Sequence, residues 1–180
     1  WTGRPGIKGL AIVARKDWNL ERLAVSSQPH VLAVKATRGS AAITLVGVWT
    51  LPVGHSYVRP ILTGIDELAG HLAGDVIVAG DLNANVGLPR KPNFEVARRR
   101  LADYALDSLW HARSGEVHGA EHTPTHYWKW KHELPFHLDY VFATPTLHAR
   151  CTGMQIGAFH DWVAPKLSDH VPLIADFAAV

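Results

Sequence analysis

The sequence contains little of what marks a disulfide-bonded, membrane-spanning or polycationic protein. Its 180 residues include one cysteine, Cys151, which excludes an internal disulfide and a four-cysteine zinc site. The longest mostly apolar stretch, residues 41–53, contains Thr, Gly and Pro and is too short to span a bilayer. Eighteen basic and sixteen acidic residues give a net charge of +2, so any binding of nucleic acid must depend on a local surface.

What remains is the composition of a folded chain. Hydrophobic residues make up 47% of the sequence and charged residues 19%, which excludes a disordered chain. The length predicts a single domain over residues 1–180. No signal-peptide pattern is present, and we expect a cytoplasmic, monomeric protein without a membrane span.

Short apolar runs indicate strands, and two longer patterns indicate helices. Helical spacing of apolar residues predicts helices over 58–72, with Ser56 as N-cap and Gly70 or Gly74 at the end, and over 93–105. Because strands outnumber helices and several are apolar on both faces, we predict an α/β sandwich with packed sheets and outer helices. The predicted strands are 10–14, 31–34, 43–49, 75–79, 136–143 and 171–177.

The first of three polar clusters is GDLNAN at residues 80–85, directly after an apolar run. Asp81 and Asn83 lie two residues apart and share one side if the chain is extended. A carboxylate and a carboxamide placed in this way could hold a water on a metal and a phosphate oxygen. The alternative is an ordinary turn, since Gly, Asp and Asn are standard turn residues.

The other two clusters lie near the C-terminus. Asp139 lies within an apolar run, where a carboxylate is costly to bury unless it is paired or solvated; the alternative is an edge strand facing water. Asp169 and His170 precede the last run, and neighbours in an extended chain point to opposite sides. His170 can transfer a proton or bind phosphate, and Asp169 can ligate a cation, although alone they indicate a surface loop.

Each of the three clusters lies within or at the end of an apolar strand, and a sandwich can bring side chains from such positions together at one end of its sheets. As a set, the clusters therefore favour phosphate-ester hydrolysis. An oxygen-rich group with one imidazole suits Mg²⁺ or Mn²⁺ better than zinc. Such a cation with a histidine is typical of attack by an activated water on phosphorus. The members of this group are Asp81, Asn83, Asp139, Asp169 and His170.

In chain order, the clusters resemble the signature of the endonuclease/exonuclease/phosphatase superfamily, which has the deoxyribonuclease-I-like fold. GDLN at 80–83, LDYVF at 138–142 and SDH at 168–170 match its three motifs, and PTHYW at 124–128 and GLAI at 9–12 resemble two further segments. The resemblance covers nearly the whole chain. It implies an α/β/β/α sandwich of two packed, mostly antiparallel sheets with outer helices.

The resemblance also implies roles. Asp81 would orient or deprotonate the attacking water, and Asn83 would hold that water or the phosphate. His170 would bind the phosphate or transfer a proton, Asp139 would fix its tautomer, and Asp169 would ligate Mg²⁺ or Mn²⁺. Contacts to substrate are expected from Trp49, Asn85 and Trp128; Trp49 stands where many members place a catalytic His or Tyr, a role that Trp cannot fill.

One departure from the family pattern concerns the beginning of the chain. The family normally opens with a strand carrying an Asn and a strand ending in Gln-Glu, whose Glu is the principal metal ligand. Neither is present, and Glu21 lies in the wrong context to replace that Glu. We therefore expect an N-terminally truncated member with weakened Mg²⁺ binding.

The remaining features have simpler explanations. Residues 126–132 interleave aromatic and basic side chains, which can stack bases or lie at a lipid interface; the alternative is an alternating strand. Residues 111–126 are polar and predicted to form a loop. Without an HExxH pattern, the other histidines are expected to be loop or hydrogen-bonded residues and not zinc ligands, and Cys151 a small core residue.

The sequence thus predicts a divalent-metal-dependent phosphodiester hydrolase, foremost a nuclease acting on DNA by in-line attack of water. One alternative is a phosphatase or phosphodiesterase for a small or lipid phosphate ester, which the weak net charge permits. The other is a non-catalytic module that binds phosphate or nucleic acid, which the absent Glu favours.

Overall fold

The computed structural model describes residues 1–4, 8–23 and 26–178. Its centre is a six-stranded sheet in the order β3-β4-β5-β6-β10-β7, in which β5 and β6 are parallel and the other pairs antiparallel. The strands are β3 (Asn19–Arg22), β4 (Val31–Arg38), β5 (Ala41–Trp49), β6 (Val76–Asp81), β10 (Asp139–Ala143) and β7 (Asp107–Ser108).

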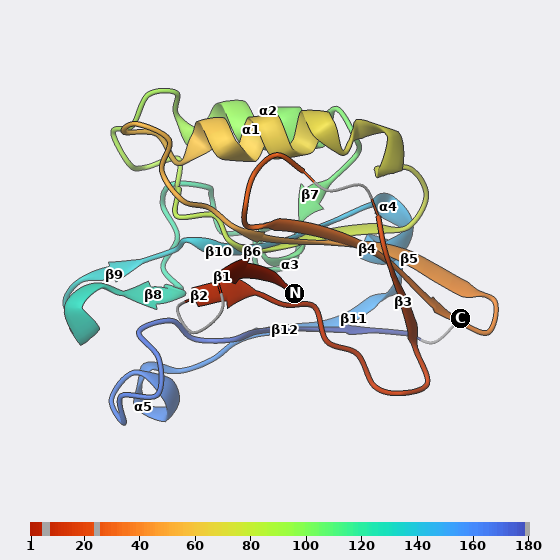
Figure 1. Cartoon of the computed structure of the whole chain (residues 1–180). Helices are drawn as coiled ribbons and strands as arrows, with labels where there is room; N and C mark the ends of the chain where they lie inside the picture. The colour runs from red at the N-terminus through yellow and green to blue at the C-terminus, as the bar shows by residue number, and fades with distance from the viewer. Residues whose placement is uncertain (5–7, 24–25, 179–180) are drawn as a thin grey trace.

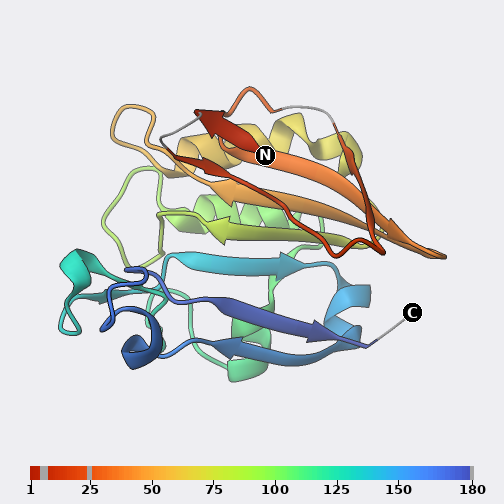
Figure 2. The same cartoon turned by 60° about the horizontal axis from the view of Figure 1, so that its bottom comes forward.

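Three antiparallel pairs complete the strands. They are β1 (Thr2–Arg4) with β2 (Lys8–Leu10), β8 (His126–Tyr127) with β9 (Pro135–Phe136), and β11 (Cys151–Ile156) with β12 (Leu173–Phe177). The β8–β9 pair and the short helix α5 (Phe159–Trp162) lie at one end of the molecule in both views (Figures 1 and 2). The same end carries the C-terminus of β6 and the N-terminus of β10 (Figure 2).

Helices α1 (Val58–Glu67) and α2 (Phe94–Ala102) lie side by side over one face of the central sheet (Figure 1). Alternate strand residues such as Val76 and Val78 pack against Ile61 and Leu101 of the helices to form the larger core. Helix α2 begins at a side-chain cap, since the Asn93 side chain accepts a hydrogen bond from the Glu95 amide. The N-cap of helix α1 is Tyr57, which makes no side-chain cap hydrogen bond, and not the predicted Ser56. The remaining helical segments are η1 (Ala69–His71), α3 (Leu109–Ser114), η2 (Trp128–Trp130) and α4 (Pro145–Arg150).

The opposite face of the sheet packs against β11 and β12. Ile77 and Ala79 of β6 alternate with the residues that face the helices, and they pack against the second core together with Leu173 and Ala175 of β12. Two sheets therefore pack face to face with helices outside, which confirms the predicted α/β sandwich of mostly antiparallel sheets. No helix in the described ranges is long and apolar enough to cross a membrane.

Some local predictions were wrong. The run 10–14 is largely outside a strand, because β2 ends at Leu10 and Val13 is 87% exposed. Residues 126–132 do not form an alternating strand, since Lys129 and Trp130 have positive φ angles of 54° and 62° and the chain turns there. The predicted loop 111–126 begins inside α3. Cys151 is buried at the start of β11, as predicted.

Candidate functional site

Three neighbouring strands carry their functional side chains at one level of the sheet. Asp81 is directly opposite Asp139 in the β6–β10 pair and is aligned with Trp49 in the β5–β6 pair. Because side chains alternate along a strand, Asp81 lies on the same face as Ile77 and Ala79, which is the face turned toward β11 and β12. Strand register thus brings these three side chains to the mouth between the two sheets.

Gly80 allows this arrangement. Its φ angle is 141°, and a Cβ atom on it would lie 2.9 Å from the carbonyl carbon of Val48 and closer still to the carbonyl oxygen. Only glycine avoids that overlap while β5 and β6 remain paired at this point. The first residue of the GDLN motif therefore has a steric function.

Asn83 orients the Asp81 carboxylate from the turn after β6. The Asn83 amide donates to Asp81 Oδ1 at 2.9 Å, and its Nδ2 donates to Oδ2 at 2.8 Å and to the Thr50 carbonyl at 3.3 Å. Asn83 has a φ of 48°, a conformation that Asn tolerates better than most residues. The hydroxyl of buried Thr50 donates to the Leu82 carbonyl and fixes the same turn.

His170 completes the site from the loop before β12. Its Nδ1 lies 2.8 Å from Asp139 Oδ2, and its Nε2 lies 4.0 Å from Asp81 Oδ2. The Asp139 carboxylate accepts the Nδ1 proton, which fixes the ring and leaves Nε2 facing the cleft. The Ser168 hydroxyl accepts from the His170 amide and holds this segment in place.

The two central groups have perturbed acidities. Burial, followed by the charge of Asp139, raises the pKa of Asp81 to about 6, against the opposing effect of His170. Burial by itself would lower the pKa of His170, but its hydrogen bond to Asp139 and the charges of Asp139, Asp81 and Asp169 outweigh it and raise the pKa. Asp81 therefore changes charge at a pH of about 6, and His170 stays protonated to a higher pH than an unperturbed imidazole, which suits a base and an acid in catalysis.

The cleft holds about 520 Å³, and Lys8, Trp49 and Asp169 line it together with these residues. Lys8 comes from β2, and its Nζ lies 5.9 Å from the centre of the Trp49 ring. Sequence reasoning missed Lys8, because only the long-range packing of β2 against β5 brings it to the cleft. An oxygen-rich group with one imidazole is present, and ligand atoms of Asp81, Asp139 and His170 lie within 4.8 Å of one another.

His126 was also missed as a neighbour of the site. Its ring packs 4.5 Å from that of His170, and its Nε2 lies 3.8 Å from Asp169 Oδ2. Burial, and then the charge of His170, lower the pKa of His126. The PTHYW segment contains this residue, and its similarity to a family motif was the signal that could have identified it.

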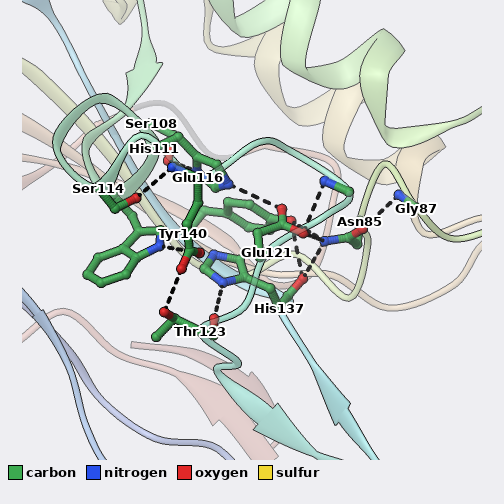
Figure 3. Close-up of polar contacts among 12 residues, drawn as sticks. Asn85, Gly87, Ser108, His111, Ser114, Glu116, Glu121, Thr123, His137 and Tyr140 are labelled. Carbon is green, nitrogen blue, oxygen red and sulfur yellow. Dashed lines mark hydrogen bonds and ion pairs between the residues drawn. The ribbon is translucent and has the colours of Figure 1, made fainter.

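Two of the expected substrate contacts lie elsewhere. Asn85 is buried, and its Nδ2 donates to Glu121 Oε2 at 2.9 Å, the His137 carbonyl at 3.1 Å and the Tyr140 hydroxyl at 3.2 Å (Figure 3). Trp128 is half exposed in η2 and does not line the cleft. The structure gathers in the cleft the other predicted residues, namely Asp81, Asn83, Asp139, Asp169, His170 and Trp49.

Chemically, the cleft offers a carboxylate of raised pKa, an amide beside it and an imidazole held by a second carboxylate. A proton acceptor and a proton donor then face the same space, as hydrolysis by an activated water requires. The basic Lys8 adds a positive charge for an anionic substrate.

Comparisons with known proteins agree with this arrangement. A family model described as the Endonuclease/Exonuclease/phosphatase family matches residues 2–170. No curated protein sequence matches the chain.

Several solved structures share the fold at low identity. The endonuclease domain of TRAS1, a telomere-specific non-LTR retrotransposon, has a TM-score of 0.68 at 16% identity, over 93% of this chain and 72% of that one. The 3′ phosphatase NExo from Neisseria, bound to product DNA hairpin, has a TM-score of 0.64 at 15% identity, over 91% and 71%. An AP endonuclease from Archaeoglobus fulgidus has a TM-score of 0.57 at 17% identity, over 82% and 65%.

Proposed function

The chain belongs to the endonuclease/exonuclease/phosphatase family, and on that premise we propose that it is a divalent-metal-dependent nuclease that hydrolyses phosphodiester bonds of DNA. Family membership makes it a hydrolase of the nuclease and phosphatase kind. The observation that carries the finer proposal is the hydrogen bond between Asp139 and His170, placed beside the Asp81–Asn83 pair in one cleft.

The residues present fit a hard divalent cation. The burial of Asp81 beside Asp139 raises the pKa of Asp81, and a cation would relieve the repulsion between the two carboxylates. Asp169, which lines the same cleft, would ligate the ion, because oxygen ligands suit Mg²⁺ and Mn²⁺. When bound, the cation supplies charge stabilisation to the phosphate under attack.

The chain's own residues supply the proton transfers. Ionised Asp81 accepts a proton from the attacking water, while Asn83 keeps the carboxylate oriented through two hydrogen bonds. Protonated His170, held by Asp139, presents Nε2–H to the phosphate or to the leaving oxygen. Because Asp81 must be ionised and His170 protonated, activity is expected to have a lower and an upper pH limit.

DNA is favoured as the substrate by the surroundings of the cleft. Lys8 and Trp49 offer a positive charge and an aromatic face on one side. Outside the cleft, half-exposed Trp128 has Lys129 Nζ 4.4 Å from its ring centre, a pairing that can stack a base and contact phosphate. The neighbouring structures described as AP endonuclease, retrotransposon endonuclease and a phosphatase on a DNA hairpin support the same class.

Nicking of supercoiled plasmid in Mg²⁺ tests the proposal, with Asp81→Asn and His170→Ala as variants. We expect each to lower the rate by about 100-fold or more, since a positioned acid or base contributes about 10² to 10⁴. His71→Ala in η1, which lies outside the cleft lining, is the matched control and should nick at the wild-type rate. Circular dichroism confirms that each variant is folded.

The outcomes separate the alternatives. Equal nicking rates in His170→Ala and His71→Ala would refute the assignment of the site. Hydrolysis of bis-p-nitrophenyl phosphate without plasmid nicking would replace DNA by a small ester as the substrate. Binding of DNA in EDTA with no product in Mg²⁺ would identify a binding module, and the salt dependence of that affinity would report the phosphate contacts.

A further inference from the structure

We propose that His111, His118 and Glu121 form a second metal site, distinct from the catalytic cleft, that binds Zn²⁺ or a similar transition-metal ion. Each of the three offers a ligand atom, and these atoms lie within 4.8 Å of one another. Two imidazoles and one carboxylate suit zinc, whereas the oxygen-rich cleft suits Mg²⁺. The sequence predicted that the histidines of this segment are loop or hydrogen-bonded residues; His118 lies in a turn, but its ring has no hydrogen bond among the described residues.

The distance between the ligand atoms of His111 and Glu121 already suits a shared zinc ion. His111 Nε2 lies 3.2 Å from Glu121 Oε1, and the two side chains are 6% and 4% exposed. Zinc bonds of about 2.0–2.1 Å in a tetrahedral arrangement place neighbouring ligand atoms roughly 3.4 Å apart. The ion would replace the shared proton between these two atoms.

His118 is the residue that a hydrogen-bond network leaves unexplained. Both of its ring nitrogens are buried and have no hydrogen-bond partner among the residues that the structure describes. Its ring stacks on that of His111, with centroids 3.5 Å apart and planes 12° from parallel. Parallel rings cannot direct lone pairs at one ion, so the His118 ring must turn on binding. This rotation of the ring breaks no hydrogen bond, and it gives a buried ring nitrogen the metal ion as its partner.

Hydrogen bonds to neighbouring residues orient the other two ligands, His111 and Glu121 (Figure 3). The Ser108 hydroxyl lies 2.7 Å from His111 Nδ1, and a hydroxyl can accept the Nδ1 proton when Nε2 binds a metal. Glu121 Oε2 accepts from Asn85 Nδ2 at 2.9 Å and from the Gly119 amide at 3.0 Å, which leaves Oε1 for the ion. Such outer hydrogen bonds orient metal ligands in proteins.

The protonation states are those that bind metal. Burial, followed by the nearby His111 and Arg98, lowers the pKa of His118 to about 4. Burial would raise the pKa of Glu121, but hydrogen bonds from His111, Asn85 and Gly119 prevail and lower it to about 2. At neutral pH the site therefore offers a neutral His118 imidazole and a carboxylate. Bound metal would join α3 to the turn at 118–121 and, through Asn85, to the segment that follows the GDLN motif.

Thermal unfolding with and without Zn²⁺ tests the site after dialysis against EDTA. Zn²⁺ at 100 times its dissociation constant should raise the melting temperature by about 5–10 °C. His118→Phe keeps the aromatic stack but has no ligand atom, and it should lose this stabilisation. His122→Phe, a histidine that lines the neighbouring cavity and is outside the cluster, should keep it.

A second readout separates this site from the cleft. Co²⁺ in a tetrahedral site with nitrogen ligands absorbs visible light, and we expect the band in wild type and in Asp139→Asn but not in His118→Phe. Glu121→Gln provides a further variant if His118→Phe does not fold, and it should weaken Zn²⁺ binding at least tenfold. Absence of stabilisation in wild type, or equal Zn²⁺ stabilisation in wild type and His118→Phe, would overturn the proposal.

Discussion

Replacing Gly80 by Ala should destabilise the protein more than any other single methyl addition to a described glycine near the cleft. The φ of 141° is strained for any residue with a Cβ, which costs about 1–3 kcal/mol. The new methyl would also overlap the Val48 carbonyl group, and relief by shifting backbone costs about 1–3 kcal/mol more. The expected loss in the free energy of unfolding is therefore about 2–6 kcal/mol, or roughly 5–20 °C in melting temperature for a chain of this length.

Two other glycines separate these contributions. Gly74 has a φ of 81° with open space around its Cβ position, so Gly74→Ala carries the strain alone, about 1–2 kcal/mol. Gly70 has neither positive φ nor a close neighbour, so Gly70→Ala should be neutral or stabilising by up to about 1 kcal/mol. Chemical denaturation of the three variants, fitted with a common m-value, gives the ranking.

A Gly80→Ala variant as stable as Gly74→Ala would refute the steric argument, because it would show that β5 and β6 are not held together at Val48. Plasmid nicking adds a functional readout. Since Asp81 follows Gly80 directly, a shift of about 1 Å in the strand should lower the rate by about 100-fold even in the folded fraction.

The acidities give further predictions. In EDTA, NMR titration of His170 should show a pKa above its usual value in wild type and a lower one in Asp139→Asn; an unchanged value would contradict the Asp139–His170 contact. Because that raised pKa stabilises the fold at low pH and the effect is lost as pH rises through it, Asp139→Asn should destabilise more at pH 5.5 than at pH 8. Arg98 lowers the pKa of Glu95 to about 2, so Glu95→Gln should cost about 0.5–1 kcal/mol at pH 7, and calorimetry should show the difference vanish as pH falls from 4.5 toward 2.

The central sheet and the cleft were the most predictable parts. β5, β6 and α1 have continuous or helically spaced apolar residues, and burial of those residues decides their structure. Asp81 ends β6 and Asp139 begins β10, so each sets a carboxylate beside an apolar strand, and that local conflict between charge and burial is typical of a functional position. The motif resemblance then placed His170 with them.

The remaining errors arose where tertiary contacts override local pattern. Alternating polarity at 126–132 left a strand open as one alternative, but positive φ angles at Lys129 and Trp130 make a turn there. Lys166, from outside the turn, lies 4.9 Å from the centre of the Trp130 ring, a contact that the local sequence does not show. His111 and His118 were predicted to be loop or hydrogen-bonded residues, because nothing in the local sequence shows that their rings stack or that Glu121 lies beside His111. Asn85 was expected at the substrate from the motif resemblance, whereas the structure shows its side chain bonded to Glu121, the His137 carbonyl and Tyr140.

Trp49, Asp81 and Asp139 are aligned across three strands. Whether the Asp81 side chain points into the cleft therefore depends on whether the number of residues before it in β6 changes by an odd or an even number. Insertion of one residue into β6 before Asp81 would rotate the carboxylate to the side where Val76 and Val78 pack against the helices, whereas two residues would restore its side. Insertions and deletions upstream of the GDLN motif should therefore be tolerated in even numbers within the strand and in any number in the loops. Hydrolytic activity, if the proposed site is correct, would therefore also report whether these strands have paired in the correct register.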